Sequence, residues 1–93
     1  MRLASFLLPS AAATPEQFRQ GYAGANPNFY QRALFENGAV LRQLDDLGFD
    51  FAAFSEHHFH LEGLEMSNNP ILLGAWAAGL TTRLRIAQMA TVL

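Results

Sequence analysis

The sequence predicts an α/β fold built around a parallel β-sheet, and three observations lead to that prediction. Short apolar runs typical of buried strands alternate with two stretches that carry helix signals. Their order is strand, helix, strand, helix, strand, which favours β-α-β units with parallel strands. Of the 93 residues, 51% are apolar and only 15% are charged, so we expect a packed core rather than a disordered chain.

The first predicted strand is the apolar run of residues 3–8, which Pro9 ends. A continuous apolar run of this kind predicts a strand buried on both faces of a parallel sheet. A secretory signal peptide is the alternative interpretation, but the run is shorter than a usual apolar signal region. In the long connection that follows, Thr14 can cap a helix, Pro15 suits its first position and Gln17 stands three residues after the cap. These residues predict a short helix.

A longer helix is predicted over residues 28–47 because apolar residues recur there at spacings of three and four. The apolar stripe consists of Ala33, Leu34, Val40, Leu41, Leu44 and Leu47. The polar residues between them are expected to face water, and these are Arg32, Glu36, Arg42, Gln43 and Asp46. Gly48 stands where a helix commonly ends in the left-handed conformation. Residues 49–55, dominated by Phe and Ala, then predict a second strand.

Asn69 and Pro70 predict the start of a second long helix, because Asn is a good cap and Pro suits the first turn. The helix is expected to run to about Leu80. It is apolar almost all round and rich in Ala and Gly, which predicts that it is covered on both sides. A short turn leads to residues 84–93, the third predicted strand.

The chain contains neither a G-x-G-x-x-G turn nor a G-x-x-x-x-G-K turn, so dinucleotide and P-loop folds lack their glycine signatures. The remaining parallel architecture is the N-terminal β-α-β-α-β portion of a (β/α)8 TIM barrel. Such a barrel takes about 250 residues to close. We therefore expect residues 1–93 to form an incomplete, N-terminal part of one barrel domain.

Composition excludes several classes of function. The net charge is −2 and all six basic residues are Arg, which is not the basic footprint of a non-specific nucleic-acid binder. The absence of Lys excludes lysine Schiff-base chemistry, and the absence of Cys excludes disulfides and thiolate nucleophiles. No apolar run is long enough to cross a bilayer. We expect a cytoplasmic protein with no nucleic-acid or membrane partner.

The side chains that can carry chemistry follow the second predicted strand, where α/β proteins bind ligands. This segment, Glu56 to His60, contains all three histidines of the chain. Adjacent residues of an extended segment face opposite sides, so His57 and His58 are not expected to enter the same pocket. Three interpretations stay open. The histidines are structural, or one of them faces a substrate or cofactor, or His58 and His60 bind a metal together with Glu56 or Glu62.

The run FAAFSEHHFHLEG, then NNP opening an Ala-rich helix, then TTRLRIAQMATVL, resembles the N-terminal part of the luciferase-like, flavin-dependent monooxygenases. That family includes the bacterial luciferase subunits. The resemblance implies a TIM barrel in which reduced FMN, supplied by a reductase or by NAD(P)H, reacts with O2 and oxidises a small organic substrate. A deazaflavin-dependent, hydride-transferring oxidoreductase is the alternative within the same resemblance. The full-length protein is expected to be a dimer.

The resemblance also implies roles for particular residues. His57 matches a histidine near the flavin, with hydrogen bonding to the reacting flavin or acid–base help as its role. Glu56 and His58 match flanking cofactor-site positions that brace the strand end. Met89 and Ala90 match the place behind the flavin ring where such barrels carry a bulged, often cis peptide.

A second function remains open beside the enzyme. The chain can be a non-catalytic piece that associates with a partner through open strand edges, because unpaired edges readily pair with other chains. In such barrels the phosphate-binding parts lie in late strands, which this chain lacks. We therefore expect the isolated 93 residues to be inactive and to bind flavin weakly or not at all.

Overall fold

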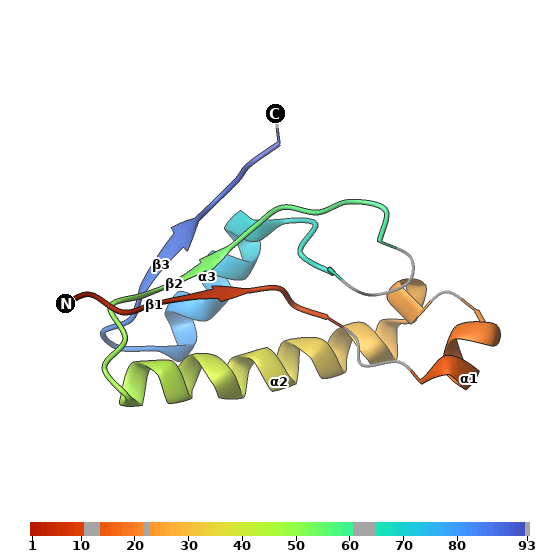
Figure 1. The fold of residues 1–93 in the computed structure, drawn as a ribbon, viewed down its shortest axis with the longest axis horizontal. Coiled ribbons are helices and arrows are strands. Elements are labelled where there is room, and N and C mark those ends of the chain that lie inside the picture. Colours follow the sequence, from red (N-terminus) through yellow and green to blue (C-terminus); the bar gives the residue numbers. More distant parts are fainter. Residues whose placement is uncertain (11–13, 22, 61–64, 93) are drawn as a thin grey trace.

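The computed structural model describes residues 1–10, 14–21, 23–60 and 65–92, and its centre is a three-stranded parallel sheet (Figure 1). The strands are β1 (Ala4–Leu7), β2 (Phe51–Phe54) and β3 (Arg85–Gln88), in the order β1-β2-β3. The helices are α1 (Pro15–Arg19), the 3-10 turn η1 (Ala23–Ala25), α2 (Pro27–Asp46) and α3 (Pro70–Leu80). The predicted α/β class and the alternation of strands with helices are confirmed.

The register of the sheet brings the carboxyl ends of the strands to one edge. Leu7 pairs with Phe54, and Phe54 pairs with Gln88. One further hydrogen bond extends the ladder, because the Met89 N–H donates to the Phe54 carbonyl at 2.8 Å. The segments that follow the three strands therefore leave the sheet side by side.

Side-chain caps start the helices where the sequence predicts. The Asn69 side chain accepts the Leu72 N–H at 3.0 Å, and Pro70 occupies the first turn of α3. At α1, the Thr14 hydroxyl accepts the Gln17 N–H at 3.2 Å while the Gln17 side chain accepts the Thr14 N–H at 2.9 Å. This reciprocal pair satisfies two N–H groups that a helix start leaves without partners, so both predicted starts are confirmed.

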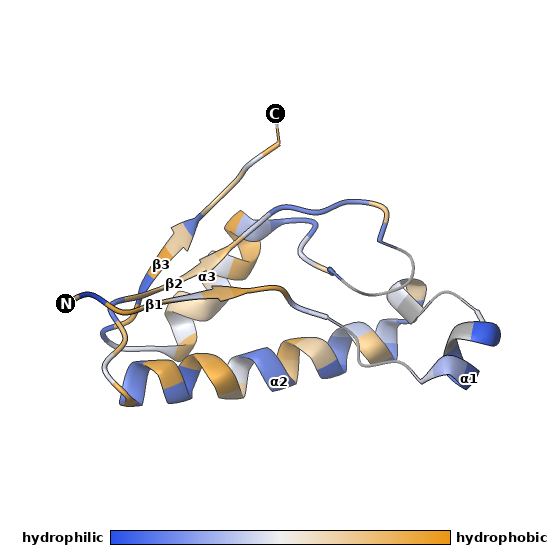
Figure 2. Ribbon diagram, in the orientation of Figure 1, coloured by the Kyte–Doolittle hydropathy of each residue, from blue (hydrophilic) through white to orange (hydrophobic). Residues whose placement is uncertain are grey.

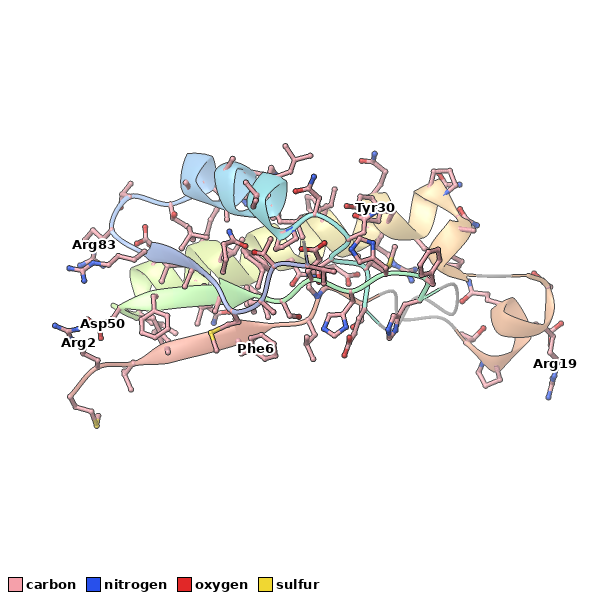
Figure 3. The ribbon with its side chains drawn as sticks, turned by 90° about the horizontal axis from the view of Figure 1, so that it is seen from above. Arg2, Phe6, Arg19, Tyr30, Asp50 and Arg83 are labelled. Carbon is pink, nitrogen blue, oxygen red and sulfur yellow. The ribbon has the colours of Figure 1, made fainter. Side chains whose placement is uncertain are left out.

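Helices α2 and α3 lie on one face of the sheet, and the core forms between them and the strands (Figures 1 and 3). The buried members of this core are Leu7, Leu41, Leu44, Ala52, Phe54, Leu73, Ala77 and Leu84. Trp76 of α3 is partly buried and packs against these core residues. The hydropathy colouring shows β1 and β2 as largely apolar, whereas β3 begins and ends in hydrophilic residues (Figure 2).

Two burial predictions are wrong because the described residues place helices on one face of the sheet only. Strand β1 is not buried on both faces, since Phe6 remains 53% exposed. Helix α3 is not covered on both sides either, since Ile71 and Leu72 are 62% and 66% exposed. Apolar composition reports a preference for burial, whereas burial itself requires a layer packed against that face.

Helix α2 confirms the position of the predicted helix but only part of its apolar stripe. Ala33, Leu41 and Leu44 are buried, while Val40 and Leu47 are exposed. The strands are also shorter than their apolar runs. β2 covers Phe51–Phe54 rather than residues 49–55, and β3 covers Arg85–Gln88 rather than residues 84–93. A strand extends only where a neighbour supplies ladder hydrogen bonds, which composition does not show.

Asp45, the neighbour of the predicted surface residue Asp46, is buried and ties α2 to the turn before β3. Its Oδ2 accepts the Thr82 N–H at 2.8 Å and the Thr82 hydroxyl at 2.9 Å. Its Oδ1 accepts the N–H groups of Arg83 and Leu84 at 3.0 and 2.7 Å. These bonds, led by the one from the Thr82 backbone, lower the pKa of Asp45 from 3.8 to about 2.

Arg83 adds a further bond to this connection. Its guanidinium donates to the backbone carbonyl of Asp45 at 2.7 Å. Arg83 is exposed, and its guanidinium binds the carboxyl end of α2. Figure 3 shows Arg83 at the same end of the sheet as Arg2 and Asp50, opposite the end at which Tyr30 lies.

Gly48 follows α2 with φ +81°, the left-handed conformation predicted for this position. A Cβ at Gly48 would meet no atom within 4 Å, so a substitution there costs backbone strain alone. We expect Gly48→Ala to lower the free energy of unfolding by about 1 kcal/mol, measured by urea denaturation. Gly79→Ala is the matched control, because its Cβ also meets open space and its φ is not in the left-handed region. This control should raise stability by about 0.5 kcal/mol; equal effects of the two changes would contradict the assignment.

None of the described helices is both long and apolar enough to cross a membrane. Helix α2 is long, but charged residues recur along it. Helix α3 is apolar but has only 11 residues.

Candidate functional site

A cavity of about 310 Å³ lies beyond the carboxyl end of β2. It is lined by Gly24, Tyr30, His57, His58, Phe59, His60, Glu65, Met66 and Asn68. Ligand pockets begin at about this size. Figure 2 shows the polar segment after β2 leaving a strongly apolar strand, and Figure 3 shows Tyr30 at that end of the molecule.

Backbone bonds between distant segments position the cavity walls. The His57 N–H donates to the Ser67 carbonyl at 3.0 Å, and the Met66 N–H donates to the Pro9 carbonyl at 2.7 Å. The segment that precedes α3 is thereby attached to the segments that follow both β1 and β2. This attachment brings residues 65–68 to the histidines.

The prediction that His57 and His58 cannot share a pocket is wrong, because both line this cavity. The prediction assumed an extended backbone, but the strand ends at Phe54. Phe59 then has φ 62°, a left-handed conformation that is uncommon for a bulky residue. The alternation of side chains across a strand does not apply to such a segment.

His57 forms the centre of a group of three side chains. Its Nδ1 lies 2.5 Å from Oε2 of Glu65, and both side chains are partly exposed. The His60 ring stands edge-on to the His57 ring, with centroids 5.4 Å apart and an interplanar angle of 79°. One ligand atom from each of His57, His60 and Glu65 lies within 4.8 Å of the other two. We call these three residues the His57 cluster.

Glu56 connects the segment after β2 to the segment after β3. Its Oε1 lies 2.6 Å from Nε2 of His58, and its Oε2 accepts the Val92 N–H at 2.8 Å. The hydrogen bond to His58, followed by that from Val92, lowers the pKa of Glu56 below its usual value. The lowered pKa favours the ionised form of Glu56. Its carboxylate links the segment after β2 to the segment after β3.

Met89 and Ala90 follow β3 at the same edge of the sheet. Met89 lies in a bend directly after the strand. Neither residue is among those that line the cavity beyond the carboxyl end of β2. The described peptide bonds are all trans. The cis peptide that the resemblance suggests at this position is therefore not present in the described residues.

The described residues group differently from the metal-ligand set considered from the sequence. His58 pairs with Glu56 rather than with His60, and Glu62 lies outside the described residues. The structure instead brings Glu65 to His57 and His60. Glu65 is not evident as a site residue from the sequence, because its contact depends on backbone hydrogen bonds of residues 66 and 67 to other segments, and no local spacing indicates these bonds.

The cavity suits the ring of a flavin better than its phosphate. Tyr30, Phe59 and Met66 offer apolar surface, and His57 and Asn68 offer polar groups that can hydrogen-bond to ring nitrogens and oxygens. Among the described residues that line it, none is an Arg. The residues present therefore fit the reactive ring, and the phosphate would need groups from elsewhere.

A parallel sheet with histidines and carboxylates gathered beyond its carboxyl edge defines an α/β protein with a ligand site in the usual position for enzymes of this class. The sequence model of the luciferase-like monooxygenases matches residues 1–93. The chain belongs to the luciferase-like monooxygenase family, so the resemblance recognised from the sequence is confirmed. Members of this family are oxidoreductases that generally use reduced flavin. A search of curated proteins found no match to this chain.

Proposed function

We propose that this chain is the N-terminal β-α-β-α-β portion of a TIM barrel that acts as a flavin-dependent monooxygenase. The site would hold FMN, reduced by a reductase or by NAD(P)H, whose two electrons would allow O2 to oxidise a small organic substrate, with one oxygen atom entering the product and the other leaving as water. The observation that carries the proposal is the position of His57. In a chain of this family, it lies beyond the carboxyl end of β2 and in a ligand-sized cavity.

The chemistry of this chain centres on the imidazole of His57. Its Nδ1 faces the Glu65 carboxylate, which fixes the orientation of the ring and leaves Nε2 as the nitrogen that can exchange a proton or a hydrogen bond with a bound group. FMN would supply the redox chemistry. Glu56 and His58 would brace the rim of the site, and Met89 and Ala90, which follow β3, would be cofactor-binding residues outside the described lining of the cavity.

Because the described residues that line the cavity include no Arg to bind a phosphate, we propose that later strands of the barrel complete the site. The isolated chain should then bind FMN weakly, and micromolar affinity would contradict this part of the proposal. We also propose that the complete protein is cytoplasmic and dimeric. Deazaflavin is the alternative cofactor.

The sheet edges support a second candidate function, in which the chain associates with a partner and does no chemistry. β1 and β3 each pair with β2 alone among the described strands, and Phe6 on β1 is half exposed. A stoichiometric complex in size-exclusion chromatography, without flavin turnover in the assay below, would favour this candidate.

The test of the enzyme proposal replaces His57 in the protein that contains the complete barrel. With NADH, a flavin reductase and FMN, His57→Ala should lower substrate oxidation by about 100-fold while FMN affinity changes only a few-fold. His57→Gln keeps a hydrogen-bonding group without acid–base capacity, so recovery of activity in this variant assigns hydrogen bonding as the role. An unchanged rate in His57→Ala would contradict the proposal, as would turnover that needs deazaflavin and consumes no O2.

A further inference from the structure

We propose that the His57 cluster is a binding site for a divalent transition-metal ion of the zinc class. The three side chains come from two segments, with His57 and His60 after β2 and Glu65 just before α3. Metal binding by the cluster does not rest on the proposed flavin reaction.

The donor set is the first argument. Two imidazoles and one carboxylate are a ligand set that zinc uses where a fourth position stays open to water or to a ligand. Imidazole donors also favour zinc, nickel or copper over magnesium or calcium, which prefer oxygen ligands. The cavity of about 310 Å³ beside the cluster has room for a molecule at the fourth position.

The spacing of the donor atoms is the second argument. All three lie within 4.8 Å of one another. A tetrahedral zinc ion with bonds of about 2.0–2.2 Å holds its ligand atoms about 3.4 Å apart. The widest separation in the cluster therefore needs to contract by about 1.4 Å at most, and the 2.5 Å approach of Glu65 to Nδ1 of His57 needs to open by about 0.9 Å. None of its residues belongs to a helix or strand, so small changes in side-chain torsions and loop backbone can supply this movement.

The charge around the cluster is the third argument. The described residues that line the cavity include no Arg to repel a cation, and Glu65 supplies a carboxylate. Glu65 already approaches Nδ1 of His57 to 2.5 Å, so two donor atoms of the cluster lie together before any metal is present. A metal ion bound by the cluster would displace to solvent any proton that its ligand atoms carry.

His58 provides a matched comparison within the same segment. It also lines the cavity, but its Nε2 lies 2.6 Å from Glu56 and it is outside the cluster. A site built by the cluster must depend on His60 and Glu65 and not on His58. Non-specific binding of the metal to histidines would instead depend on all three histidines.

The test measures Zn2+ binding to the chelator-treated chain by competition with a chromophoric chelator, in the absence of flavin. We expect a dissociation constant in the micromolar range or below. His60→Ala and Glu65→Gln should each weaken binding by at least about 100-fold, and His58→Ala should change it less than about 3-fold. Co2+ in the unsubstituted chain should show the intense visible absorption of tetrahedral coordination, which keeps the test valid even if one variant fails to fold.

Two results would overturn the metal site. One is a dissociation constant weaker than about 100 μM for Zn2+ in the unsubstituted chain. The other is an equal loss of affinity in His58→Ala and His60→Ala, both folded by circular dichroism. Because no flavin is present, neither result bears on the monooxygenase proposal, and failure of that proposal leaves the zinc measurement unchanged.

Discussion

Replacing Phe54 with alanine should lower the free energy of unfolding by about 3–5 kcal/mol. Phe54 is 0% exposed and lies at the end of β2, the central strand, where it pairs with both neighbours. It belongs to the core that joins the sheet to α2 and α3. Small domains have about 5–15 kcal/mol of stability in total, so this single change should remove a large part of it.

Urea denaturation followed by circular dichroism measures the effect of Phe54→Ala. Phe35→Ala is the matched control, because Phe35 lies on α2 with 79% of its surface exposed. The same chemical change there should alter stability by less than about 0.5 kcal/mol. A similar loss in both variants would mean that Phe54 does not lie in the core.

Replacing Asp45 with asparagine should lower the melting temperature by about 10 °C. Asp45 accepts four hydrogen bonds from Thr82, Arg83 and Leu84, two on each carboxylate oxygen. Asparagine keeps one acceptor oxygen and turns an NH2 group toward N–H donors, which then lose their partners. Asp46→Asn is the control on the adjacent, exposed residue and should leave the melting temperature nearly unchanged.

The Asp45 contribution should also depend on pH in a defined direction. Its pKa in the folded chain, about 2, lies below the ordinary value of 3.8, so the unfolded chain binds the proton more readily. The stabilisation is therefore complete above about pH 4 and is lost as the pH falls toward 2. The stability difference between the unsubstituted chain and Asp45→Asn should narrow over that range. If the stability difference between the two proteins does not change with pH, the negative charge of Asp45 does not contribute to the stability of the turn.

Local signals in the sequence were sufficient to predict where the helices lie. Asn69 and Pro70 start α3, and Gly48 adopts the left-handed conformation directly after α2. Caps and helix-ending glycines act on backbone groups within a few residues, so their effect does not depend on the rest of the fold. The order of elements followed from the same signals and was enough to predict parallel strands.

The candidate site was predicted only in part. The three histidines do gather at the carboxyl edge of the sheet, as the position of the segment after β2 implied. Glu65 was missed because it reaches His57 through backbone bonds of Met66 and Ser67 to distant segments. Glu56 was expected at the site, but its bond to the Val92 N–H depends on the placement of the segment after β3.

The sequence was therefore enough to predict the α/β class, the helix starts, the family and the histidine segment, because each rests on neighbouring residues or on a motif. The three-dimensional fold was needed to show which charged groups have partners and which apolar faces are covered. Asp45, one position from a residue correctly expected in water, is buried because Thr82 to Leu84 turn their N–H groups toward it. Ile71 and Leu72 are as apolar as the core but stay exposed. Both outcomes depend on contacts between residues far apart in the chain, and such contacts leave no periodic signal in the sequence.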